Sequence, residues 1–229
     1  MKYIVAWVLA VLASLLFVGS ASAKSFVDLT LGDVKAEERV TVANPKPVQL
    51  LFQFKTAGNL NARATKFLKD RVTAQIRSNG AFSEVSEQPV SGGAIMQITI
   101  DNLAAPEAVG QGVAAGLTFG LAGQLVADNY EATLEYVSGP DTKAVSKTVR
   151  HRLYTTIGRH ADPQNAVRVR NADEGITMIV RQVLDRLVTD LTRDVGFGAV
   201  AAPSPPTEAA PAAPVTASEP APAPGGGAR

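Results

Sequence analysis

The sequence contains no cysteine, only two histidines and few aromatic residues. Without cysteine the chain has neither disulfides nor a thiolate metal site, so the fold must be held by its core alone. His151 and His160 have no second histidine and no carboxylate pair at metal-ligand spacing. We therefore expect no metal site and no cofactor.

The chain also lacks a surplus of charge of either sign: 22 basic and 21 acidic residues give a formal net charge of +1. Proteins that bind nucleic acid normally carry a basic surplus, so nucleic acid is not an expected partner. The sequence has no G-x-S-x-G, H-E-x-x-H or G-x-x-x-x-G-K-[ST] motif. We expect a protein that is not an enzyme and has no catalytic residues.

Residues 1–23 have the pattern of a cleavable secretory signal peptide. Lys2 precedes an uncharged run, Ile4–Val18, and an A-x-A site ends at Ala23. An uncleaved anchor helix is the alternative, but the run is shorter than the roughly 20 residues that span a bilayer. We expect cleavage near Ala23 and a mature protein, formally neutral, in the periplasm or cell envelope. No cysteine follows the site that could be acylated.

Residues 199–229 are rich in proline and alanine and end near a glycine run. Such a segment cannot bury enough apolar surface to offset its ordering entropy, which predicts a disordered tail. Residues 24–198 are long enough for one domain with a core of its own.

Period-two alternation of apolar residues predicts the strands. Residues Ser138–Asp141 have turn composition, so the segments on either side are expected to form an antiparallel hairpin. The opening stretch, Phe26–Val42, is expected to add an edge strand or two. The four main predicted strands are Val48–Phe54, Ala94–Asp101, Tyr130–Tyr136 and Ala144–Ile157.

Two amphipathic helices are predicted, Asn59–Asn79 and Asp173–Asp194. In the first, Asn59 is expected to cap the start and Gly80 to end the helix. Its apolar stripe comprises Leu60, Ala64, Phe67, Leu68, Val72 and Ile76. Its basic side is expected to be a solvated surface, with contact to anionic lipid as the alternative; it carries Arg63, Lys66, Lys69, Arg71 and Arg77.

The second helix is expected to carry two ion pairs on its outer surface, because its basic and acidic residues lie four apart. The elements together predict an α+β fold, with an antiparallel sheet of about four to five strands and both helices on one face. Their order is strand, helix, strand, glycine-rich insert, strand, strand, helix. The expected ion pairs are Arg181 with Asp185 and Arg186 with Asp190.

The insert, 109–127, has no charged residue. Gly112, Gly116 and Gly120 lie four apart, beside Phe119, as in the small-residue interfaces of membrane helices. Three interpretations remain: a spanning helix, an apolar segment that dips into a bilayer or joins copies, and a loop that covers its own domain. A spanning helix would separate strands that must pair, so association with a membrane or with other copies is preferred.

The strand Ala144–Ile157 places two arginines on one side, and Val167–Arg170 repeats the alternation. If both segments join one sheet, four arginines could line one face and bind an anionic ligand or an acidic protein. An ordinary solvated face is the alternative. The four are Arg150, Arg152, Arg168 and Arg170.

The order of these elements, with the insert ending in Ala127-Asp128-Asn129-Tyr130, resembles that of small uncharacterised bacterial envelope lipoproteins with a compact α+β domain. That class usually carries a lipobox cysteine, which is absent here. The resemblance implies no catalytic residues. It also implies that the glycine-rich insert or a partner protein anchors the chain to the envelope.

The sequence thus leads to two hypotheses. The first is a non-enzymatic envelope protein that associates with a membrane surface, an envelope protein or copies of itself through its glycine-rich segment. The second is a soluble periplasmic module that binds an anionic ligand or an acidic partner through its arginine face.

Overall fold

A computed structural model describes residues 23–103 and 123–197. Two α-helices and an eight-stranded sheet make up this part of the chain, with short 3-10 turns at Ala36–Glu38 and Val195–Phe197. The helices are α2 (Ala62–Ser78) and α4 (Ala172–Thr192). The strands are β1 (Lys24–Asp28), β2 (Val48–Thr56), β3 (Asn59–Leu60), β4 (Val85–Ser86), β5 (Ile95–Leu103), β6 (Gln124–Val137), β7 (Val145–Ile157) and β8 (Ala166–Val169).

The sheet is mixed, with the strand order β3-β2-β5-β6-β7-β1-β8 and with β4 also paired to β2. The predicted antiparallel sheet of four to five strands is therefore wrong, although the fold is α+β overall. The predicted hairpin is confirmed as β6 and β7, which pair antiparallel over their length. In contrast, β2 pairs in parallel with β5 and with β4.

The parallel pairing of β2 and β5 follows from the helix between them. A tight turn can join only antiparallel neighbours, whereas parallel neighbours need a crossover, here α2. Asn61, not Asn59, caps α2, because its side chain accepts the N–H of Ala64 at 2.9 Å. Asn59 belongs to β3, and Gly80 follows the helix with φ of +68° as expected.

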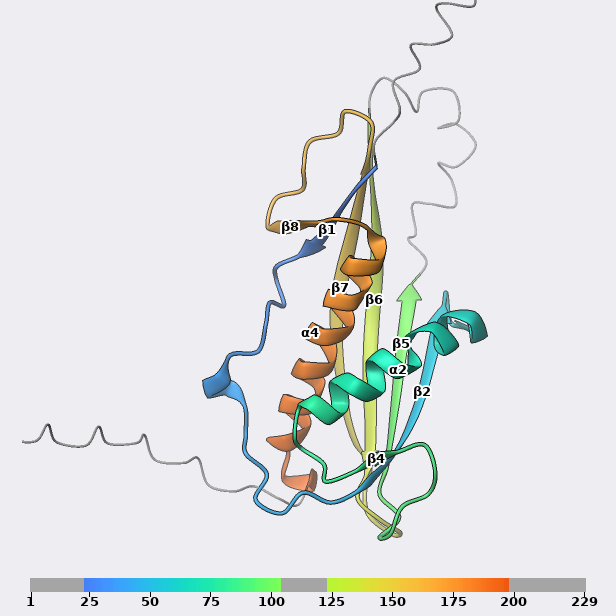
Figure 1. Ribbon diagram of the computed structural model, residues 1–229, viewed down its shortest axis with the longest axis vertical. Helices are drawn as coiled ribbons and strands as arrows, with labels where there is room; N and C mark the ends of the chain where they lie inside the picture. Colours follow the sequence, from blue (N-terminus) through green and yellow to red (C-terminus); the bar gives the residue numbers. More distant parts are fainter. Residues whose placement is uncertain (1–22, 104–122, 198–229) are drawn as a thin grey trace, which may run out of the picture.

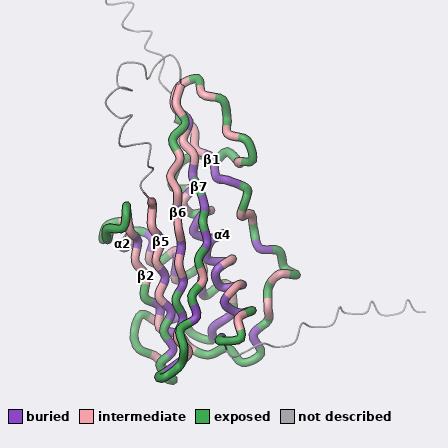
Figure 2. The backbone as a smooth tube through the Cα atoms, turned by 180° about the vertical axis from the view of Figure 1, so that it is seen from behind, coloured by how far each residue is buried: buried purple, intermediate pink, exposed green. Residues whose placement is uncertain are grey.

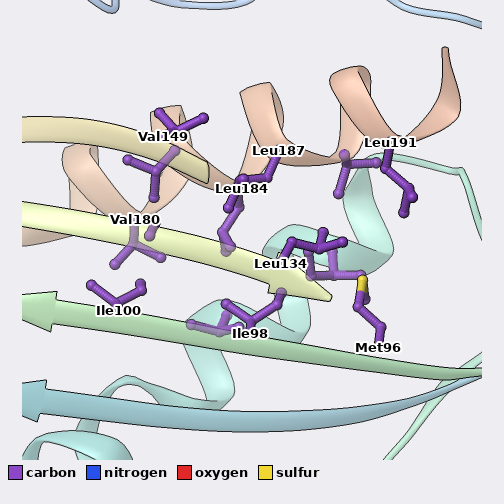
Figure 3. Packing of buried hydrophobic residues seen from close by; sticks show 14 of the residues in the cluster. Met96, Ile98, Ile100, Leu134, Val149, Val180, Leu184, Leu187 and Leu191 are labelled. Atoms are coloured by element: carbon purple, nitrogen blue, oxygen red, sulfur yellow. The ribbon is translucent and has the colours of Figure 1, made fainter. Parts of the chain in front are cut away.

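The core lies between the sheet and the two helices, which cover one face and contact each other (Figures 1 and 3). Apolar side chains alternate along the central strands, and α4 meets them with a wide apolar stripe. Figure 3 shows this contact for Val180, Leu184, Leu187 and Leu191 against Met96, Ile98, Ile100, Leu134 and Val149.

The ion pairs on the outer side of α4 differ from those predicted within the helix. Arg181 pairs with Asp33 at 2.8 Å, and Arg186 pairs with Glu38 at 2.8 Å. Both acidic partners lie in the stretch between β1 and β2, which runs along α4 (Figure 1). Asp185, expected on the surface, is 3% exposed. The charges of α4 therefore attach this stretch to the domain.

The opening stretch contributes β1, but not at an edge. β1 lies between β7 and β8 and pairs antiparallel with both. Gly175, near the start of α4, allows the helix to approach this part of the sheet: a Cβ there would lie 2.6 Å from Leu153 Cδ1. The remainder of the predicted edge segment, up to Val42, forms no strand.

Candidate functional site

The four predicted arginines do not form one cluster. The register places Arg150, Arg152 and Arg168 on the face away from α4, but β1 separates β7 from β8 and inserts the buried Phe26 between them. Arg170 follows β8 at the start of α4. Two of the four are paired already: Arg150 bonds Glu131 at 2.8 Å, and Arg170 bonds Glu174 at 3.2 Å.

A cavity of about 250 Å³ opens where β1 diverges from β7. It contains Arg150 and Arg152 but neither Arg168 nor Arg170. Its lining residues are Asp28, Thr30, Leu31, Arg150, His151 and Arg152. The cavity therefore brings together half of the predicted arginine face, next to a carboxylate.

His151 is buried beside this cavity and links three parts of the chain. Its Nδ1 accepts the backbone N–H of Arg152 at 2.8 Å, so its proton sits on Nε2 and is donated to Gln182 Oε1 at 2.6 Å. Gln182 in turn donates to Asp33 at 2.8 Å. β7, α4 and the stretch after β1 are thus joined by one hydrogen-bonded chain, and His151 is accounted for without a ligand.

Asp28 has a pKa below its usual range. Burial alone raises the pKa, but hydrogen bonds from Thr30 and from the Tyr154 hydroxyl outweigh it. The carboxylate is therefore favoured in the folded state. Its contribution to stability is present above the unfolded-state pKa of about 3.9 and is lost as pH falls through the folded-state pKa.

Substitution of Tyr154 by Phe is expected to weaken the pH dependence of stability, because it removes one donor that favours the Asp28 carboxylate. The free energy of unfolding should fall by about 1–2 kcal/mol at pH 7, and the loss should shrink below about pH 3. Urea unfolding between pH 7 and pH 2 measures both. An equal loss at every pH would show that Tyr154 acts through packing alone.

A second surface lies at the end of the sheet from which segment 104–122 departs. The final residues of β2 and β5 are neighbours there, with Thr56 opposite Asn102. The turn after β2 is fixed to β5: Ala57 N–H donates to Asn102 O at 2.8 Å, and Gly58 N–H donates to Asp101. We call this region, Lys55–Leu60 with the first turns of α2, the insert end.

Two large apolar side chains of the insert end are exposed, although the sequence placed them in the apolar stripe of α2. Leu60 is 63% exposed and Phe67 is 56% exposed, whereas Leu68, Val72 and Ile76 are buried. The Arg71 guanidinium lies 4.5 Å from the Phe67 ring centroid and is itself bonded to Asp173 at 2.8 Å. The Phe67 ring is thus held at the surface by a contact that reaches α4.

Two exposed basic side chains, Arg63 and Lys66, lie in the first two turns of α2 beside Phe67. Lys55 lies on the opposite face of the sheet, in a polar cavity that Asp101, Glu131 and Glu135 also line. Lys55, Arg63 and Lys66 have no acidic partner within salt-bridge distance among residues 23–103 and 123–197. Further along the helix, Lys69 pairs with Glu87 and Arg71 with Asp173. At the other end of α2, Arg77 donates to the backbone oxygen of Val85 at 2.8 Å. Arg63 and Lys66 are therefore the basic residues without an acidic partner, among the described residues, that lie beside Phe67 at the insert end.

The predicted association residues Gly112, Gly116, Phe119 and Gly120 lie outside the described residues. The structure does shorten the insert, because Gln124 to Ala127 belong to β6. Gly123 precedes that strand with φ of +71°, and a Cβ there would lie 2.9 Å from the Arg159 carbonyl carbon. A side chain at position 123 would therefore be strained and would collide with the backbone.

Within the described ranges, no helix is long and apolar enough to cross a membrane. The same ranges hold no group of three or more His, Cys, Asp or Glu side chains able to bind a metal ion.

Neither a family model nor a curated protein matches the chain. Among solved structures, a PelC variant from Paraburkholderia phytofirmans is 8% identical with a TM-score of 0.33 and covers 74% of this chain and 95% of that one. A second PelC structure from the same organism is 7% identical with a TM-score of 0.31, over 74% and 95% of the two chains. An uncharacterised protein is 11% identical with a TM-score of 0.30, over 69% and 95%.

The two PelC structures are dodecamers, so self-association, which is one of the expectations from the sequence, occurs among these neighbours. At such TM-scores and identities the likeness carries no argument about what this chain does.

Proposed function

We propose that the chain is a non-enzymatic exported protein that attaches to an anionic membrane surface through its insert end. One observation carries the proposal: the insert end holds the exposed apolar side chains Leu60 and Phe67 together with Arg63 and Lys66, which have no acidic partner among residues 23–103 and 123–197. Residues 109–122, in the segment that departs from this end of the sheet, have no charge. The surface at the insert end and the sequence of the segment attached to it therefore have compatible chemistry.

The arrangement suits the boundary between headgroups and acyl chains. Exposed Leu60 and Phe67 can bury apolar surface there, and each nearby Lys or Arg adds about 1 kcal/mol of attraction to anionic lipid. Because Arg71 already fixes the Phe67 ring, little side-chain entropy is lost on binding. The glycine-rich segment would supply the remaining apolar contact.

Vesicle flotation tests the proposal on the mature chain, residues 24–229. We expect the protein to float with vesicles rich in phosphatidylglycerol, to stay below vesicles of phosphatidylcholine alone, and to be released by high salt. Replacing both Arg63 and Lys66 by Glu should lower binding at least tenfold. Replacing both Leu60 and Phe67 by Ser should also lower vesicle binding at least tenfold, but the decrease of binding with salt concentration should stay as in the wild type.

Lys143 provides the matched control. It is exposed in the turn between β6 and β7, at the opposite end of the sheet, so Lys143→Glu reverses one charge away from the insert end, as Arg63→Glu or Lys66→Glu alone does within it. Deletion of 109–122, which stops before Gly123 and leaves β6 complete, tests the segment itself. A protein that never floats with anionic vesicles, or that loses binding equally with Lys143→Glu, would contradict the proposal.

Binding of an anionic ligand by the four arginines has less support. The four do not share one surface, and two of them, Arg150 and Arg170, already bond carboxylates of the domain, Glu131 and Glu174. The cavity beside Arg152 is the one feature that favours this second function.

A further inference from the structure

One edge of β7 has no strand partner along most of its length. On the other side, β6 pairs with β7 from Val145 to Ile157 in an unbroken register. β1 pairs with β7 only from Leu153 to Thr156 and then diverges toward β8 (Figure 1). Within the described part of the chain, the edge of β7 from Val145 to Arg152 therefore has no strand partner, and Thr30 and Leu31 face its last residues, Arg150–Arg152, across a cavity.

The direction of the backbone groups along this edge can be derived from Arg152. Its N–H donates to the His151 ring rather than to a neighbouring strand. In an antiparallel strand, alternate residues direct their N–H and C=O to the same side. Ser146, Thr148 and Arg150 therefore present their backbone groups to the same open side.

The side chains leave this edge accessible. Exposed and buried positions alternate along β7 (Figure 2). Ser146, Thr148 and Arg150 are exposed on the sheet face away from α4, whereas Val145 and Val149 are buried on the helix face. A row of unpaired N–H and C=O groups flanked by exposed side chains is a template for strand addition. It lies away from the insert end and makes no use of the membrane surface proposed above.

The charges along the edge favour one partner and one register. If two copies pair antiparallel about a two-fold axis at Thr148, each Ser146 faces an Arg150 and each Lys147 faces a Val149. An axis at Arg150 or at Lys147 would instead place two arginines or two lysines opposite each other, which is destabilising. The pairs Arg150–Glu131 and Lys147–Asp194 reduce this repulsion, whereas the register centred on Thr148 creates none. The edge thus complements itself in the register centred on Thr148.

We propose that the open edge of β7, Ser146–Arg150, pairs antiparallel with the same edge of a second copy of this chain. The two sheets would become continuous, and the helices of both copies would lie on the same side. This contact is isologous, so it closes after two copies and leaves no further open end at β7.

Charge substitution at the axis provides the first test. Thr148→Lys would place two lysines face to face, and sedimentation equilibrium of residues 24–229 should show the dimer dissociation constant rising at least tenfold. Thr133→Lys is the matched control, because Thr133 faces Thr148 on the neighbouring strand β6 and on the same sheet face. A wild-type chain that is monomeric at all concentrations, or a dimer that Thr133→Lys disrupts as strongly, would overturn the proposal.

The absence of cysteine makes crosslinking a second and independent test. Residues opposite each other in a hydrogen-bonded antiparallel pair have Cα atoms about 5.5 Å apart, within the range of a disulfide. Thr148→Cys should therefore form a disulfide-linked dimer, and Thr133→Cys should not. Equal crosslinking of both would overturn the proposal.

The register is tested by mixing two variants. Ser146→Cys and Arg150→Cys should each remain uncrosslinked alone, because like positions are far apart in the proposed register, but should crosslink when combined. Crosslinking of either variant alone, in preference to the mixture, would exclude the register centred on Thr148. Circular dichroism of each variant establishes that it is folded.

Discussion

Replacement of Leu184 by alanine is expected to lower the free energy of unfolding by about 3–5 kcal/mol. Leu184 is fully buried and points from the middle of α4 toward the sheet, near Leu134 (Figure 3). Truncating the side chain removes buried apolar surface. It also leaves a cavity, because the helix α4 and the sheet are too rigid to close the gap between them. For a domain of this size the melting temperature should fall by roughly 10 °C.

Leu60→Ala is the control for Leu184→Ala, because it deletes the same atoms from a side chain that is 63% exposed. Its effect on unfolding should stay within about 0.5 kcal/mol, while its effect on vesicle binding should be measurable. Urea unfolding of both variants gives the comparison. A loss of stability for Leu60→Ala as large as for Leu184→Ala would show that Leu60 is covered in solution.

Replacement of Arg39 by methionine is expected to lower the free energy of unfolding by about 2–3 kcal/mol at pH 7. Arg39 bonds the Asp185 carboxylate at 2.9 Å, and Gln75 donates to the other carboxylate oxygen at 2.6 Å. The Asp185 side chain is almost fully buried, whereas that of Arg39 is 43% exposed. Removing Arg39 therefore leaves a buried negative charge with one neutral donor.

A double-mutant cycle with Asp185→Asn separates charge from packing. In that background no buried charge is left unpaired, so Arg39→Met should cost less than about 1 kcal/mol. Urea unfolding of the four proteins at pH 7 measures the coupling. If Arg39→Met is equally costly in both backgrounds, the aliphatic part of Arg39 stabilises the domain and the ion pair does not.

The sequence allowed the local elements to be predicted better than their arrangement. The hairpin of β6 and β7 follows from alternation on both sides of a turn at Ser138–Asp141, and both α-helices follow from their apolar spacing. The parallel pair of β2 and β5 was missed although the strand–helix–strand order indicates it. The place of β1 had no local signal, because its partners Leu153 and Val167 lie far along the chain.

The candidate site was predicted only in part. The spacing of apolar residues assigned Leu60 and Phe67 to the apolar stripe of α2. Spacing alone does not show which residues of such a stripe are buried against the sheet. In the structure Leu68, Val72 and Ile76 are buried and Ala64 packs against the core, whereas Leu60 and Phe67 are exposed. The signal available in the sequence was the position of Phe67 between Arg63 and Arg71, one helical turn on each side.

The position of β1 between β7 and β8 also affects the order of folding. Asp28 and its partner Tyr154 are 126 positions apart, and the other neighbour of β1, β8, lies later still. Contacts this distant in sequence require the closure of a long loop and slow the folding of a chain. We therefore expect β1 to join the sheet late in folding, which hydrogen exchange during refolding would measure.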